Sequence, residues 1–200
     1  MVYADFHVTG SLGDAASGDR FRDYGGGGTP TTWVDGRRKL SGGNDAANRY
    51  QEAYMDAASD SSVLSLQVRS QYDPSGRQAT VQVIVEIAED VTRFEECLIQ
   101  VVLVEDQVVS RERTFDRTVR MLLSPQPLVI GEAGRSQSIV QRVAIPSGWD
   151  PGELSAVAWV HRSLPNPDSS REVLNAAQSQ VFGATPILEV SWGGIKSLWR

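Results

Sequence analysis

The stretch that most constrains the fold is Gly27-Gly28-Thr29-Pro30-Thr31-Thr32-Trp33-Val34-Asp35-Gly36. A run of glycines at 25–28 leads into it, and glycine frees the backbone for a tight loop. Residues 31–34 are β-prone, Asp35-Gly36 is a turn signal, and residues 37–40 can return as a paired strand. The stretch therefore predicts a glycine loop followed by a short β-hairpin.

Three elements are predicted around this hairpin. Residues 2–8 alternate apolar and polar side chains and predict a strand. Residues 14–24 can hold one or two helical turns. A longer helix is predicted over 44–59, because Asn44 is a good N-cap and apolar side chains then recur at helical spacing.

Beyond residue 62 the apolar period changes from that of a helix to that of a strand. A covered central strand is predicted at 97–104, which is apolar on both faces, and residues 107–113 are expected to return beside it. Residues 172–182 fit a helix or a strand, and the all-β context favours a strand. The other predicted strands are 63–69, 79–87, 139–145 and 154–161. The set predicts an antiparallel β-sandwich over 63–183.

Composition argues against several classes of function. The net charge of −6 and the isoelectric point near 5.0 argue against a nucleic-acid partner. No apolar run reaches the roughly 18 residues that a membrane-spanning helix requires. The N-terminus lacks the basic and apolar regions of a signal peptide. A single cysteine, Cys97, excludes an intrachain disulfide.

No catalytic, cofactor-binding or metal-ligating set is predicted. Cys97 lies in the central strand and is expected to be a buried, unreactive thiol. His7 and His161 are expected at outward strand positions, and neither has a second ligand at metal-binding spacing. No Gly-x-Ser-x-Gly nucleophile turn occurs, and no Gly-Lys-Ser/Thr follows the glycine run.

Short motifs along the chain resemble the outer-membrane-protein-28-related family. They include Phe6-His7-Val8, the stretch 28–36, Arg117-Thr118-Val119-Arg120-Met121-Leu122 and Val157-Ala158-Trp159-Val160-His161. The resemblance implies a mostly β, α+β chain: a partial thioredoxin-like segment over 1–62 and an immunoglobulin-like sandwich over 63–183. It also implies a bacterial protein in an extracytoplasmic place, secreted or associated with the outer membrane, if the parent gene carries a signal peptide.

The chain departs from a thioredoxin-like protein in one respect. The strand and helix that carry a Cys-x-x-Cys have no counterpart here, so either the chain is N-terminally truncated, which we favour, or the remnant rearranges around the sandwich. The resemblance makes Thr29-Pro30 a cis-proline loop, and Thr29 and Pro30 a contact for an extended peptide; the alternative is an inherited structural turn. The tail, 184–200, is expected to be a separate segment that docks through its tryptophans or serves export.

We therefore expect a non-catalytic binding or structural module of the cell envelope, with an extended peptide or another envelope protein as partner. The alternative is a fragment of a thiol-disulfide oxidoreductase whose catalytic half is not in this chain. A third hypothesis is a sandwich that binds glycans or a metal ion.

Overall fold

The structure is a computed structural model. It describes residues 2–7, 12–13, 15–26, 28, 30–42, 46–164, 171–179 and 182. The predictions for Thr29, for the start of the helix at Asn44 and for the tail 184–200 lie outside these residues.

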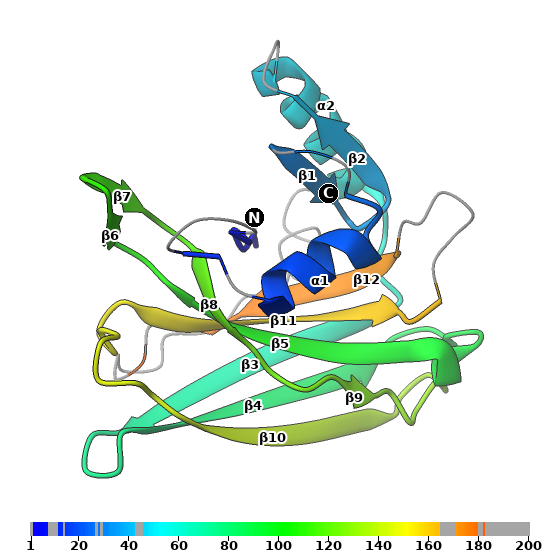
Figure 1. Ribbon diagram of the computed structural model, residues 1–200. Helices are drawn as coiled ribbons and strands as arrows, with labels where there is room; N and C mark the ends of the chain where they lie inside the picture. The colour runs from blue at the N-terminus through cyan, green and yellow to red at the C-terminus, as the bar shows by residue number, and fades with distance from the viewer. Residues whose placement is uncertain are drawn as a thin grey trace.

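Two antiparallel sheets pack face to face (Figure 1). The small sheet has the order β10-β4-β3, with β3 at Leu64–Asp73, β4 at Gln78–Ile87 and β10 at Ser136–Ala144. The large sheet has the order β12-β11-β5-β8, and β9 also pairs with β5. Its strands are β5 Cys97–Glu105, β8 Thr118–Leu122, β9 Gln126–Pro127, β11 Leu154–Arg162 and β12 Val173–Gln178. The predicted sandwich is confirmed as two packed antiparallel sheets.

Strand β5 shows why the large sheet has two apolar faces. Its alternate residues Ile99, Val101 and Leu103 belong to the core between the sheets. The intervening residues Val102 and Val104 belong to a second cluster on the opposite, outer face. Both sets are buried, so β5 carries apolar residues on both of its faces, as predicted for a covered strand, with Gln100 and Glu105 as its polar exceptions.

The expectation that residues 107–113 return beside β5 is wrong. Strand β6, Val108–Ser110, pairs with β7, Arg113–Phe115, as a separate two-stranded ribbon, and β8 lies next to β5. Arg111 and Glu112 adopt left-handed conformations (φ 48° and 63°) and form the turn of this ribbon. The turn reverses the chain away from β5, and the chain returns beside β5 only with β8.

The strand predicted at 2–8 is an extended segment, 2–7, joined to β8 by one parallel bridge between Asp5 and Thr118. Arg117, at φ 57°, bends the chain just before β8, so the pairing does not continue toward Tyr3. The predicted alternation holds, because Val2, Ala4 and Phe6 pack against the outer cluster of the large sheet.

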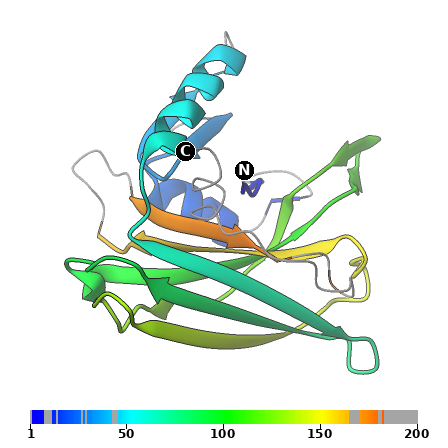
Figure 2. The same ribbon diagram turned by 180° about the vertical axis from the view of Figure 1, so that it is seen from behind.

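The remaining elements form a cap on the outer face of the large sheet: segment 2–7, α1 Ala15–Asp23, the hairpin β1 Thr31–Val34 and β2 Arg38–Ser41, and α2 Ala46–Ser59. Helix α1 lies over the sheet, whereas the hairpin and α2 rise from it on the side away from the β6–β7 ribbon (Figures 1 and 2). The predicted hairpin and both predicted helices are confirmed over these residues.

The turn of the hairpin anchors the cap to β12. The amides of Arg171 and Val173 donate to the carbonyls of Gly36 and Asp35, at 3.1 and 2.8 Å. Gly36 has φ +67°, and a Cβ there would lie 1.9 Å from the Arg171 carbonyl oxygen. Glycine is therefore required at this contact for both its conformation and its size.

Candidate functional site

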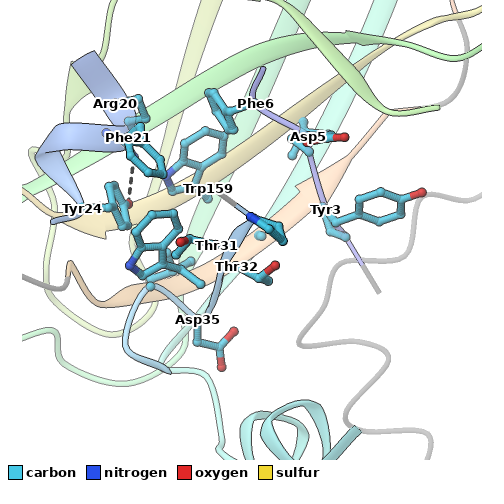
Figure 3. A pocket seen from close by; sticks show the side chains of 18 of the residues that line it. Tyr3, Asp5, Phe6, Arg20, Phe21, Tyr24, Thr31, Thr32, Asp35 and Trp159 are labelled. Carbon is cyan, nitrogen blue, oxygen red and sulfur yellow. Dashed lines mark hydrogen bonds between the residues drawn. The ribbon is translucent and has the colours of Figure 1, made fainter. Parts of the chain in front are cut away.

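A cavity of about 700 Å³ lies between the cap and the outer face of the large sheet. Segment 2–7, α1, β1 and the hairpin turn line it from the cap, while β11 and β12 contribute residues from the sheet. Figure 3 shows aromatic rings from α1, from segment 2–7 and from the sheet turned toward this space. Its size falls within the range of small-molecule and peptide-side-chain pockets, roughly 300–1,000 Å³.

Aromatic side chains make up one wall of the cavity. The Trp33 ring on β1 meets the rings of Phe21 and Tyr24 on α1 edge to face, with centroids 5.8 Å apart in each pair. Trp159 of β11 also lines the cavity, from the sheet. Such rings provide rigid apolar surface for a ligand, and their edges and faces favour other aromatic or cationic groups.

Arg20 lines the same cavity from α1. Its guanidinium stands 4.5 Å from the centroid of the Tyr24 ring and 5.2 Å from that of the Trp159 ring, and it donates a 2.9 Å hydrogen bond to the Tyr24 hydroxyl. Burial lowers the pKa of Arg20 and raises the pKa of Tyr24. Within the described part of the chain, none of the ion pairs involves Arg20.

Strand β1 presents an open edge. The Gly42 amide donates to the Pro30 carbonyl, so these two residues form a hydrogen-bonded pair. Bonded and non-bonded pairs alternate along an antiparallel ladder, so every second pair of the hairpin, counted from this one, is hydrogen-bonded. Thr31 and Trp33 fall between them and direct their N–H and C=O groups away from β2. Among the described residues no backbone partner occupies these groups. Both residues line the cavity.

Of the two residues predicted to contact a peptide, Pro30 lines the cavity and Thr29 lies outside the described residues. Beside them, the Thr31 hydroxyl donates to the carbonyl of Gly28, and on the other face of the hairpin Thr32 reaches the Tyr50 hydroxyl of α2. The role of Thr29 and Pro30 in binding stays a prediction.

The expected outward position of His161 needs correction. Its side chain does leave the core between the sheets, but it is only 1% exposed. Burial, followed by the charge of Arg20, lowers the pKa of His161 to about 4. Nδ1 donates to the Arg162 carbonyl at 2.9 Å, and buried Nε2 has no hydrogen-bond partner among the described residues. The imidazole is therefore neutral at pH 7.

His7 lines the cavity and is partly buried. Its Nε2 lies 3.5 Å from the Asp5 carboxylate, and its ring meets Phe115 of β7 edge to face, at 5.2 Å between centroids. Cys97, on the opposite side of the large sheet, is buried in the core, and burial raises the pKa of its thiol. The prediction of a buried cysteine is confirmed.

Two searches bear on other kinds of site. Among the described residues, no three or more His, Cys, Asp or Glu side chains gather closely enough to hold a metal ion. In the same part of the chain, no helix has the length and apolar character to cross a membrane.

Most residues of the cavity were not predicted from the sequence as site residues. Arg20, Phe21 and Tyr24 were assigned only to a helical stretch, and Trp159 only to a strand. A usable signal was present: Arg20 and Tyr24 are four residues apart, which places them on one face of α1. The approach of that face to Trp33 and Trp159 depends on contacts far apart in the chain.

Comparisons with known proteins give a coarse likeness. No protein-family model matches the chain, and no curated protein sequence matches it. Among solved structures, it is similar to a domain of the outer membrane lipoprotein Omp28 from Porphyromonas gingivalis. The two are 19% identical, the match covers 62% of this chain and 93% of that one, and the TM-score is 0.37. The assignment of function therefore rests on the cavity itself.

Proposed function

We propose that this chain is a non-catalytic binding module that takes an extended peptide into the cavity between the cap and the large sheet. The edge of β1 carries the proposal, because the N–H and C=O groups of Thr31 and Trp33 have no backbone partner among the described residues and belong to residues that line a large cavity. An extended peptide that adds to such an edge gains main-chain hydrogen bonds, and pockets beside the edge receive its alternate side chains. The aromatic wall is such a pocket.

Two observations support the non-catalytic part of the proposal. The thiol of Cys97 is buried and its raised pKa keeps it protonated, so it is a poor nucleophile. His161 is covered and has no hydroxyl or thiol hydrogen-bonded to its ring among the described residues. These observations favour binding over the alternative of an oxidoreductase fragment.

The placement in the cell envelope, as a secreted or outer-membrane-associated module, follows from the family resemblance of the sequence. The same resemblance supports a division at residues 62 and 183, with a thioredoxin-like remnant preceding an immunoglobulin-like sandwich. Another envelope protein could supply the extended peptide.

Amide chemical shifts on the two edges of the hairpin test the proposed function. The probes are N-acetylated tetrapeptide amides that carry an aromatic or aliphatic side chain at the third position. We expect the amide signals of Thr31 and Trp33 to shift and their hydrogen exchange to slow. Lys39 and Ser41 are the matched control, because they pair with Trp33 and Thr31 and present their amides on the far edge. Shifts absent from Thr31 and Trp33, or equal on both edges, would refute edge binding.

A further inference from the structure

Arg20 is an unusual residue to find in this cavity. A guanidinium is charged at every physiological pH, and its transfer from water is costly unless an anion or several acceptors meet it. Within the described ranges, the groups that meet it are one hydroxyl and two ring faces. Asp23, on the same helix, acts on Arg20 only as a weak charge and makes no ion pair with it. Among the residues that the structure describes, the guanidinium thus lacks the anionic partner that its burial calls for.

A second arginine near Arg20 also calls for an anionic partner. Arg171, just before β12, adds positive charge near Arg20 and contributes to the lowered pKa of both Arg20 and His161. Its Nε is buried and has no hydrogen-bond partner among the described residues. The neutral His161 adds no charge of its own, and β11 contains no acidic residue that could offset the two arginines. Arg20 and Arg171 therefore place two positive charges at the α1 and β11 side of the cavity, while the carboxylates of Asp5 and Asp35 also line it.

We propose that Arg20 binds the C-terminal carboxylate of the peptide, a proposal that rests on the function proposed above. A carboxylate fits a guanidinium through two parallel hydrogen bonds, and the pair is strengthened in a site with little water. Arg20 stacks beside Tyr24, and Tyr24 meets Trp33, so the cation and the aromatic wall are adjacent.

The C-terminal carboxylate of a peptide fits this arrangement better than the carboxylate of an acidic side chain does. In a C-terminal residue the carboxylate and the side chain leave the same Cα, so Arg20 can hold the carboxylate while an aromatic or aliphatic side chain enters the wall formed by Phe21, Tyr24 and Trp33. An Asp or Glu residue would use its side chain for the charge and leave the wall empty. The ligand class is accordingly a peptide that ends in an aromatic or large aliphatic residue with a free carboxylate.

The test compares three probes by the fluorescence of the cavity tryptophans: N-acetyl-Ala-Ala-Phe as the free acid, the same peptide as the amide, and N-acetyl-Ala-Asp-Phe amide. We expect the acid to bind about ten- to a hundredfold more tightly than the plain amide. Arg20→Gln should abolish this preference, and Arg20→Lys should keep part of it. Arg22→Gln is the matched control, because Arg22 lies on the same helix, is exposed and pairs with Asp19. It should preserve the preference.

Each other result is decisive. Equal binding of acid and amide would overturn the carboxylate proposal and leave peptide binding standing. An Asp-containing amide that binds as tightly as the acid would show that a side-chain carboxylate suffices, which refutes recognition of the chain end. If no probe changes the fluorescence or the Thr31 and Trp33 amide signals, the proposed function fails as well. Should Arg20→Gln unfold, the comparison of acid with amide on the unaltered chain still decides.

Discussion

The sandwich and the cap are built by different means. The sandwich has long strands, with ten residues each in β3 and β4, and its core residues are almost completely buried. The cap has a nine-residue helix, a hairpin with four-residue strands and a fourteen-residue helix. Elements this short are marginal by themselves in water. The cap therefore depends on the outer face of the large sheet, and this incomplete packing is what leaves room for a ligand.

The largest effect is expected in the sandwich. Leu103→Ala removes a fully buried side chain from β5, between the two sheets. We expect the free energy of unfolding, measured by denaturant titration, to fall by about 2–5 kcal/mol. Val109→Ala is the control: it changes an exposed side chain on the β6–β7 ribbon and should stay within about 0.5 kcal/mol of the parent. A loss at Leu103 no larger than that of the control would mean that this core does not carry the stability.

Acid should weaken the contact between cap and sheet. The pKa of His161 is about 4 when folded and about 6.5 when unfolded. The unfolded state therefore binds a proton first as the pH falls, and stability that is complete above pH 6.5 is lost down to about pH 4. Between pH 7.5 and 5 this group should account for about 2 kcal/mol of lost stability.

His161→Gln isolates this contribution, because glutamine has no proton to gain in that range. The variant should lose less stability than the parent between the two pH values, as measured by denaturant titration at each. Equal losses in the two proteins would contradict a buried, neutral His161.

Gly36→Ala should detach the cap from β12 with a smaller effect on global stability. Alanine at Gly36 meets both a left-handed conformation and a clash with the Arg171 carbonyl, whereas Gly42 has φ +84° with open space around it. Gly42→Ala is therefore the control, and each of the two substitutions should cost about 1–2 kcal/mol of backbone strain. Only Gly36→Ala should speed amide exchange at Arg171 and Val173, whose amides bond the hairpin turn. Faster exchange in both variants would show that strain alone loosens the anchor.

The smallest expected effect concerns segment 2–7. The Arg117 guanidinium donates to the Tyr3 carbonyl, to Ser155 and to Gln178. Lysine cannot make this fork, so Arg117→Lys should cost about 1 kcal/mol. Amide exchange at Asp5 and Val119, which bond across the bridge, should rise. Arg111→Lys, on the ribbon turn, is the control and should leave both amides unchanged.

The sequence predicted regular elements well and their assembly only in part. The alternation of apolar residues in β4 and the apolar residues on both faces of β5 could be predicted, because the pattern of apolar residues along a strand indicates which of its faces are buried. The pairing of residues 107–113 was misjudged, because the left-handed turn falls on Arg111 and Glu112, and neither residue type favours that conformation. His161 was misjudged because the groups that surround it, such as Arg20 of α1 and Arg171, are distant from it in the sequence or lie on another element. The cavity was missed for the same reason: Arg20, Trp33 and Trp159 meet only after α1 and the hairpin dock on the sheet.

The buried thiol of Cys97 can report how often the sandwich opens. It is the single thiol of the sequence, and it sits in the core at the first residue of β5. A thiol reagent can reach it only when the sheets separate locally or globally, so the labelling rate at neutral pH measures how often the sandwich opens. The same measurement with and without a peptide in the cavity would report whether ligand binding outside the large sheet slows the opening of the core inside it.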